Sequence, residues 1–356
     1  MSGSKEPKPA ARHTAKRNSD VARELPFTDE RDFEDARRGF MGTLDQLKVT
    51  SDRGRVTYSL EDYGFLSEIQ PPDTVNPSLW RIARLNMNHG LFKVLDRVYQ
   101  VRGFDLANMT IVEGDSGLVI LDTMTTVESS RAGLALYFQH RPRRPVVAVV
   151  YSHSHADHYG GVRGLVTQED VQAGKVRIIA PDRFIEEVSS ENVIAGLPMV
   201  RRAQYQFGGT LPKGPRGQVD AAVGKISARG TLSLIPPTMI ITKPVETHVI
   251  DGVEMTFHLT PDTEAPADMN VYMPGLKPSI WQTMRCSVST TSIRCGAPKC
   301  VMPMPGRNTW TRPVTVSAAA PKQPATGTTG RSGAPNASTT ILPSTATCSS
   351  TCTTRP

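Results

Sequence analysis

Three histidines and one aspartate are packed into the six residues His153–His158, which follow a short apolar run at residues 145–150. The run has the length and the β-branched content of a buried strand. Polar side chains at the end of a buried strand are costly unless a partner compensates them. Imidazole nitrogens and carboxylate oxygens are the ligands that zinc takes in catalytic sites. The motif therefore predicts a metal centre, and the alternative of a histidine-rich surface loop fits the preceding strand poorly.

The spacing within this motif can serve two adjacent ions. His153 and His155 are two residues apart on an extended segment, so their side chains point the same way and can share one ion. Asp157 and His158 lie on the turn into the next predicted helix, where they can reach a second ion. Two glycines at 160–161 then allow the backbone to pack closely beneath the metals.

The net charge of +7 does not indicate nucleic-acid binding, because it is concentrated at one end of the sequence. Residues 1–276 hold 32 Lys and Arg and all 34 Asp and Glu, whereas residues 277–356 hold nine basic residues and no acidic one. All five cysteines also lie in residues 277–356, where their irregular spacing and odd number argue against a disulfide or zinc module. No apolar stretch is long enough to cross a membrane, and no signal peptide is recognisable, which favours a cytoplasmic location.

Changes in pattern divide the sequence into four segments. Residues 1–25 are polar and basic, and we expect a disordered arm. Residues 26–89 read as an N-terminal extension of helices and short turns. Residues 90–276 combine hairpins with strand–helix alternation, which predicts an α/β sandwich of sheets flanked by helices. Residues 277–356 are rich in Thr, Ser and Pro, and we expect a disordered tail.

The histidine motif after an apolar strand resembles that of the metallo-β-lactamase superfamily, and further segments resemble its alkyl sulfatase (SDS hydrolase) branch. The resemblance runs from about residue 26 to about residue 276. It implies an αββα metallo-β-lactamase-like sandwich, incomplete at its C-terminal edge, and a zinc hydrolase that cleaves sulfate esters of primary alkyl alcohols. The segments that carry it are Phe33–Phe40, Tyr99–Asp105, His153–Gly164, Glu191–Gly196, Arg201–Tyr205 and Thr263–Pro266.

The resemblance also implies a set of metal ligands for two zinc ions. By position, His153 and His155 resemble the ligands of one zinc, and Asp157 and His158 those of the other. Glu264 resembles the carboxylate that bridges the two ions. Asp157 is expected to take part in catalysis as well.

The residues around Glu264 support this assignment without deciding it. Glu264 follows a predicted strand that ends at Leu259, in a loop from which a carboxylate could reach back to the metals. The alternative is a solvated loop acid. His248 and His258 are rival ligands, but both lie on alternating strands, where a satisfied or exposed histidine is more common than a ligand.

The resemblance stops near residue 277. Complete relatives continue with a second glutamate ligand, a further zinc histidine, a helical dimerisation domain and a sterol-carrier-like domain, none of which is recognisable here. The loss of acidic residues favours a shifted reading frame over a genuine disordered extension. The family forms homodimers, and we expect this chain to lack the domain through which they form. We expect this chain to bind zinc weakly and to hydrolyse dodecyl sulfate poorly or not at all.

Three functions compete at this point. The first is a zinc-dependent alkyl sulfatase, in which Arg201, Arg202 and Lys225 are candidates for holding the anionic sulfate of the small-molecule substrate. The second is another hydrolase of the same fold, acting on a thioester, a lactam or a phosphodiester. The third is a non-catalytic fragment that keeps one metal or none. The Gly- and Pro-rich stretch 208–237 is predicted to be a binding loop.

Overall fold

The computed structural model describes residues 7–44, 47–276 and 283–284, all in the first of the two compact units into which the chain divides. The predictions for residues 1–6 lie outside the described residues. The predictions for residues 277–356 also lie outside them, apart from the short strand β14 (Thr283–Met284).

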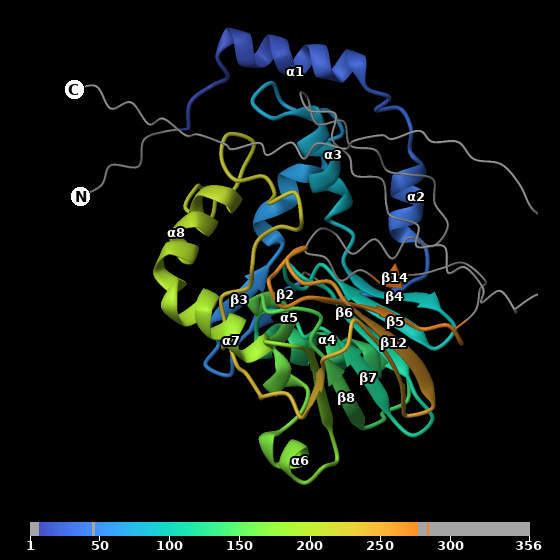
Figure 1. Ribbon diagram of the computed structural model, residues 1–356. Coiled ribbons are helices and arrows are strands. Elements are labelled where there is room, and N and C mark those ends of the chain that lie inside the picture. Colours follow the sequence, from blue (N-terminus) through green and yellow to red (C-terminus); the bar gives the residue numbers. More distant parts are fainter. Residues whose placement is uncertain (1–6, 45–46, 277–282, 285–356) are drawn as a thin grey trace, which may run out of the picture. The chain divides into compact units, whose positions relative to one another are not determined.

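An eight-stranded mixed sheet forms the centre of the described fold (Figure 1). Its first five strands pair antiparallel, and its last four pair parallel, with β7 shared between the two sets. In spatial order the strands are β1 (Phe40–Gly42), β4 (Gly90–Leu95), β5 (Val98–Arg102), β6 (Met109–Glu113), β7 (Leu118–Leu121), β8 (Val146–Val150), β9 (Arg177–Pro181) and β10 (Met239–Ile241).

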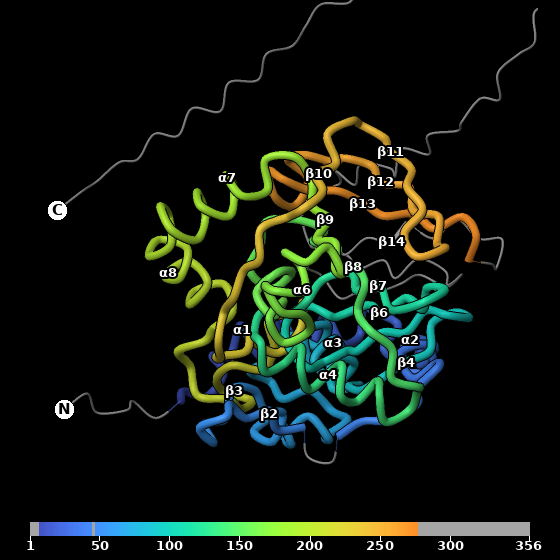
Figure 2. Tube along the Cα trace, turned by 90° about the horizontal axis from the view of Figure 1, so that it is seen from below, coloured from blue at the N-terminus to red at the C-terminus, as the bar shows by residue number. Residues whose placement is uncertain are grey.

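A second sheet packs against one face of the first, and Figure 2 shows the two layers edge-on. It consists of β11 (Val245–Ile250), β12 (Val253–Leu259), β13 (Met269–Tyr272) and β14. Met255 and Phe257 of β12 point inward and join a core with Val119 of β7. Leu118 and Ile120, the neighbours of Val119, join a separate core on the opposite face. The β7 strand is thus buried on both faces, as its continuous apolar sequence requires.

Helices cover that opposite face of the large sheet, together with a hairpin of β2 (Lys48–Thr50) and β3 (Val56–Ser59). The longest is α4 (Val127–His140). Its N-cap is Thr126, and the Thr126 side chain accepts a hydrogen bond from the Ser129 amide. The N-terminal helices are α1 (Arg12–Glu24), α2 (Arg31–Arg37), η1 (Glu61–Ser67) and α3 (Pro77–Leu85). The helices after β8 are α5 (Ala156–Tyr159), η2 (Val162–Gly164), α6 (Gln168–Gln172), α7 (Phe184–Ser189), η3 (Ser190–Ile194) and α8 (Gly196–Phe207).

The predicted sandwich is confirmed in three of its four layers. Side chains on the outer face of the small sheet, such as Glu254 and His258, are exposed, and so are Val245 and Val249 of its edge strand β11. Among the residues that the structure describes, no helix lies over this face in Figure 2. Within the described residues, the αββα architecture therefore lacks its second helical layer.

The expectation of disorder for residues 1–25 is wrong for residues 12–24, which form α1. Val21 of this helix is buried, and the Asn18 side chain donates a hydrogen bond to the carbonyl oxygen of Asp73. Lys16 and Asp20 form an ion pair one helical turn apart. One buried contact and one long-range hydrogen bond thus dock a helix that is otherwise polar, and a polar composition by itself does not reveal them.

The stretch 208–237 is a packed connection along much of its length. The Ala228 amide donates to the carboxylate of Asp105, and the Thr231 amide donates to the carboxylate of Glu128. The Ser233 amide and hydroxyl both donate to the carbonyl oxygen of Gly160, immediately behind the histidine motif. The Gly- and Pro-rich composition therefore reflects a segment that supports this motif with its backbone.

Candidate metal centre

Two neighbouring parallel strands, β7 and β8, bring the first polar side chains of the site together. Asp122 follows β7, and Ser152 lies two residues beyond the end of β8, at the same edge of the sheet. The Ser152 amide and hydroxyl donate to the two carboxylate oxygens of Asp122 at 2.9 and 3.0 Å. The Asp122 backbone has a φ of 58°, which turns the chain sharply after the strand.

His153, His155 and Glu264 offer one ligand atom each within 4.8 Å of one another. The Nε2 atom of His153 lies 3.1 Å from Nδ1 of His155 and 3.9 Å from a carboxylate oxygen of Glu264. His153 is fully buried, and its Nδ1 atom contacts the Ser152 hydroxyl at 2.9 Å, which leaves Nε2 facing the cluster. These three side chains converge, as the family resemblance implied, and their role as metal ligands stays a prediction.

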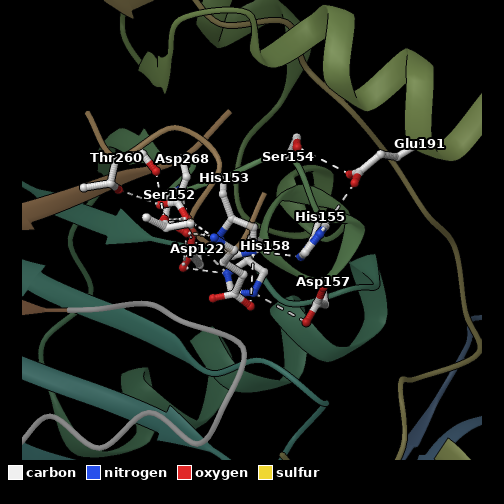
Figure 3. Close-up of polar contacts among 12 residues, drawn as sticks. Asp122, Ser152, His153, Ser154, His155, Asp157, His158, Glu191, Thr260 and Asp268 are labelled. Carbon is white, nitrogen blue, oxygen red and sulfur yellow. Dashed lines mark hydrogen bonds and ion pairs between the residues drawn. The ribbon is translucent and has the colours of Figure 1, made fainter. Parts of the chain in front are cut away.

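His158 and Asp157 form a second group directly beside the first. The Nδ1 atom of His158 lies 2.8 Å from the Asp122 carboxylate, and the His158 ring centroid is 3.9 Å from that of His153 (Figure 3). On its other side, Nε2 of His158 lies 3.4 Å from Oδ2 of Asp157. Both of these atoms are buried without a hydrogen-bond partner. Buried polar atoms without a partner are rare in proteins, and a bound metal ion is one way to satisfy them.

The electrostatics of the cluster differ from one histidine to the next. Burial, and then the neighbouring His158 and His155, lower the pKa of His153 well below its usual value, so this ring is neutral, as a metal ligand must be. Burial opposes the charged form of His158 as well, but the carboxylates of Asp122 and Asp157 outweigh it and raise the pKa of His158. Burial alone would raise the pKa of Asp157, yet His158 beside it makes the net shift downward. The cluster therefore holds carboxylate charge that a cation can compensate.

The residues present fit a metal ion. Imidazole nitrogens and carboxylate oxygens are suitable ligands for zinc. Nε2 of His158 and Oδ2 of Asp157, which are buried without a hydrogen-bond partner, lie 3.4 Å apart next to the His153 group. The glycines behind the motif are also needed there. A Cβ atom on Gly161 would lie 1.9 Å from the Ser130 hydroxyl and 2.1 Å from the Thr123 carbonyl oxygen. The close packing predicted beneath the motif is confirmed.

Four residues that contact the cluster were missed at the level of sequence. Asp122 and Ser152 orient two of the histidine rings, as described above. A carboxylate oxygen of Glu191, in the π-helix η3, lies 3.7 Å from Nε2 of His155, and the Ser154 hydroxyl donates to its other oxygen (Figure 3). Asp268 lies beside the Glu264 loop. An aspartate straight after the apolar strand 118–121 was a usable signal. Glu191 was noted only as part of a segment that resembles the family, and nothing local marks Asp268.

The candidate substrate residues do not share one environment. Lys225 is buried: its ammonium group donates to the Asp220 carboxylate at 2.9 Å and to the carbonyl oxygen of Ala83, and it lies over the Tyr63 ring. Its prediction as a sulfate-binding residue is wrong, because the charge is already used inside the N-terminal core. Arg201 and Arg202 are exposed on α8.

The two rival histidines lie on the small sheet, away from the cluster contacts. Nε2 of His248 lies 3.0 Å from the Glu246 carboxylate, and His258 is exposed on β12. Their interpretation as satisfied or exposed side chains agrees with the structure. Among the described residues, His153, His155 and Glu264 are the group of three or more possible ligands that meets within 4.8 Å.

Comparison with known proteins agrees with this geometry. A model of the metallo-β-lactamase superfamily matches residues 102–267. The chain is 52% identical over 261 residues to the alkyl/aryl-sulfatase BDS1 of Saccharomyces cerevisiae, covering 73% of this chain and 40% of the relative. It is 48% identical over 271 residues to a linear primary-alkylsulfatase of Pseudomonas sp., covering 76% of this chain and 40% of the relative.

A solved structure shows the same arrangement of the backbone. The stereoselective inverting sec-alkylsulfatase Pisa1 from Pseudomonas sp. superposes with a TM-score of 0.73 at 51% identity, over 76% of this chain and 42% of that one. The chain thus spans about two fifths of the length of the relatives that it matches. No helix among the described residues is long and apolar enough to span a membrane. Residues 102–267 are a metallo-β-lactamase domain, and the chain is similar to alkylsulfatases over about three quarters of its own length.

Proposed function

We propose that this chain is a zinc-dependent hydrolase of the sulfate esters of alkyl alcohols, with linear primary esters such as dodecyl sulfate as the first candidates. The observation that carries the proposal is the convergence of His153, His155 and Glu264 beside the Asp157–His158 pair. The relatives named above, about half identical to this chain, supply the substrate class.

We assign two zinc ions to the site. His153 and His155 would hold the first ion, Asp157 and His158 the second, and Glu264 would bridge them. The 3.9 Å between Glu264 and Nε2 of His153 supports the first part of this assignment. The orphaned atoms of His158 and Asp157 support the second part. Zinc, when bound, supplies hydroxide at neutral pH and attracts the anionic sulfate.

The remaining residues of the site hold these side chains in place and exclude water. The Asp122 carboxylate contacts Nδ1 of His158, and the Ser152 hydroxyl contacts Nδ1 of His153. Both contacts orient the rings so that Nε2 is directed into the cluster. His158 makes the net pKa shift of the buried Asp157 downward, so its carboxylate would be ionised and able to hold the second ion opposite His158. Arg201 and Arg202 are exposed on the helix that follows Glu191, where they can attract an anionic substrate.

The test is release of inorganic sulfate from dodecyl sulfate by the purified full chain with added zinc. The matched control is His258→Ala, which removes an exposed histidine from the small sheet and should leave activity unchanged. His153→Ala should abolish it. Hydrolysis in ¹⁸O-labelled water, with the label followed into sulfate or alcohol, distinguishes attack at sulfur from attack at carbon.

A second candidate is a zinc-binding chain that does not turn over. It is favoured by the ligand geometry, because among the described residues only His153, His155 and Glu264 meet as a group of three, whereas Asp157 and His158 form a pair. A catalytic zinc has three protein ligands and a water. Zinc binding without sulfate release from any alkyl sulfate would select this alternative. Comparison with a chain whose reading frame is shifted near codon 277 then shows whether added ligands restore turnover.

A further inference from the structure

Asp268 collects three hydrogen bonds around the loop that carries Glu264. One of its carboxylate oxygens accepts from the Thr260 hydroxyl at 3.2 Å. The other accepts from the Thr263 hydroxyl at 2.8 Å and from the backbone amide of Glu264 at 3.2 Å. One buried carboxylate therefore fixes both ends of the segment 260–264, including the peptide group of the proposed bridging ligand.

The backbone of Asp268 belongs to the same arrangement and also reaches the histidine loop. Its carbonyl oxygen accepts from the amide of Thr260, which closes the loop between β12 and β13. Asp268 also pairs with His153 as an isolated antiparallel bridge, flanked by hydrogen bonds from the Ser154 amide to Ala267 and from the Met269 amide to Ser152. The residue thus stands where the loop from the small sheet meets the loop after β8, as Figure 3 shows for the labelled side chains.

The groups that donate hydrogen bonds to the Asp268 carboxylate are all uncharged. Its side chain is 8% exposed, and its hydrogen-bond donors are two hydroxyls and one amide. No ion pair between Asp268 and a lysine or arginine is present in the described part of the chain. A buried carboxylate without a cationic partner is costly unless other groups compensate its charge. A metal ion held by the neighbouring His153 group would supply positive charge at short range.

We propose that Asp268 is a positioning residue that presents Glu264 to the metal. The inference rests on the metal centre of the proposed function, and it does not require that sulfate esters are the substrate. Asp268 acts through Glu264: it holds the amide and the preceding hydroxyl so that the Glu264 side chain projects toward Nε2 of His153. Its loss should therefore weaken metal binding as strongly as loss of other groups that orient ligands, about 10–100-fold.

The experiment compares zinc affinities of full-length variants by competition with a chromogenic chelator. Asp268→Asn keeps the shape of the side chain but replaces one acceptor oxygen with an NH₂ group. It should weaken zinc binding about 10–100-fold. The matched control is Asp262→Asn, which removes the same charge from an exposed position in the same loop. Asn tolerates the positive φ of that position, so the control should keep the wild-type affinity.

A double-mutant cycle separates positioning from general stability. If Asp268 acts through Glu264, Asp268→Asn should have little further effect on zinc affinity in a Glu264→Gln background. A purely structural role would give the same additional loss in both backgrounds and would overturn the proposal. The visible spectrum of bound Co²⁺ is the second measurement, because a displaced ligand changes its position and intensity.

A graded pair covers the case in which Asp268→Asn does not fold. Thr263→Val removes one donor to Asp268 and should weaken zinc binding, whereas Thr263→Ser keeps the hydroxyl and should restore the wild-type affinity. Equal affinities for these two variants would contradict the proposal, and so would a wild-type chain that binds no zinc. Zinc binding with the expected coupling but without sulfate release would reject the proposed function and leave the role of Asp268 standing.

Discussion

The two sides of the candidate metal centre are built differently. On the histidine side, the side chains of His153, His158 and Asp122 are at most 3% exposed, and they follow the ends of adjacent parallel strands. On the carboxylate side, the Glu264 side chain is 21% exposed, and His155 at the boundary between the sides is 28% exposed. The first side is fixed by the core of the large sheet, and the second by a loop of the small sheet.

This difference separates rigidity from adjustability within one site. The histidine side contains buried groups that contact one another directly, so a change there disturbs both the metal ligands and the fold. The carboxylate side is held by side-chain hydrogen bonds within a surface loop, so a change there should affect metal binding more than folding. Four substitutions or titrations test this contrast, and we take them in decreasing order of the change that we expect.

The largest effect is expected from His153→Ala, on the histidine side. Loss of a metal ligand should reduce zinc affinity by more than about 100-fold, beyond the range typical of groups that only orient ligands. Competition with a chromogenic chelator measures the loss, and His258→Ala is the control with the same chemical change on an exposed strand. Equal affinities of the two variants would remove His153 from the site.

Gly161→Ala should lower the free energy of unfolding by about 3 kcal/mol, the upper part of the usual range for overpacking. The new methyl group would meet the Ser130 hydroxyl and the Thr123 carbonyl oxygen, both of which are parts of the buried wall behind the motif. Urea unfolding of the zinc-free chain measures the change. Gly196→Ala is the control, because a Cβ atom at that position meets nothing within 4 Å. A stability equal to that of the control would show that the wall behind the motif can move.

On the carboxylate side, Glu264→Gln should weaken zinc binding by about 100-fold, at least as much as loss of the residue that positions it, while leaving the urea midpoint unchanged. The amide keeps one oxygen for the metal and loses the negative charge, and the site of substitution is partly exposed. Isothermal titration with zinc gives the affinity and the stoichiometry for both proteins. A large drop in stability with unchanged affinity would reverse the contrast between the two sides.

The smallest effect concerns Asp105, whose carboxylate accepts hydrogen bonds from Thr125 near the histidine side and from the Ala228 amide. Burial raises the pKa of Asp105 from 3.8 to about 6. The folded state therefore binds more protons than the unfolded state between these values, and stability must fall as the pH rises through that window. The loss should be about 1 kcal/mol between pH 5 and pH 6 for one such group.

Urea unfolding of the zinc-free chain at several pH values measures this slope. Asp105→Asn removes the titrating group and should remove about 1 kcal/mol of the decrease, although its overall stability is lower because one acceptor oxygen is lost. An unchanged pH dependence in the variant would show that the carboxylate of Asp105 titrates in its ordinary range.

Much of the histidine side could be predicted from sequence because its geometry is local. The apolar strand, the alternation that turns His153 and His155 the same way, and the glycines beneath them all lie within a few residues of one another. The α/β sandwich was predicted from patterns that are also local, namely the hairpins and the alternation of strands and helices in residues 90–276. The family resemblance added Glu264, for which local pattern alone left a solvated loop acid equally possible.

Predictions failed where a long-range contact decided the outcome. Residues 12–24 are polar, yet a docked helix forms because Asn18 and Val21 find partners in the N-terminal extension. Lys225 was assigned to substrate from its charge, but Asp220, Ala83 and Tyr63 enclose it. Charge and composition indicate whether a segment tends to be exposed to solvent. They do not indicate which distant groups will contact it in the folded protein.

The histidine motif, its place after a central strand and the sandwich around it could all be predicted from sequence, because strand periodicity and ligand spacing are properties of neighbouring residues. Three supporting contacts became visible only in the folded chain: Asp122 with His158, Glu191 with His155, and Asp268 with the Glu264 loop. Each of these contacts joins elements that are far apart in the chain. Their formation depends on the pairing and packing of whole strands, which no local pattern encodes.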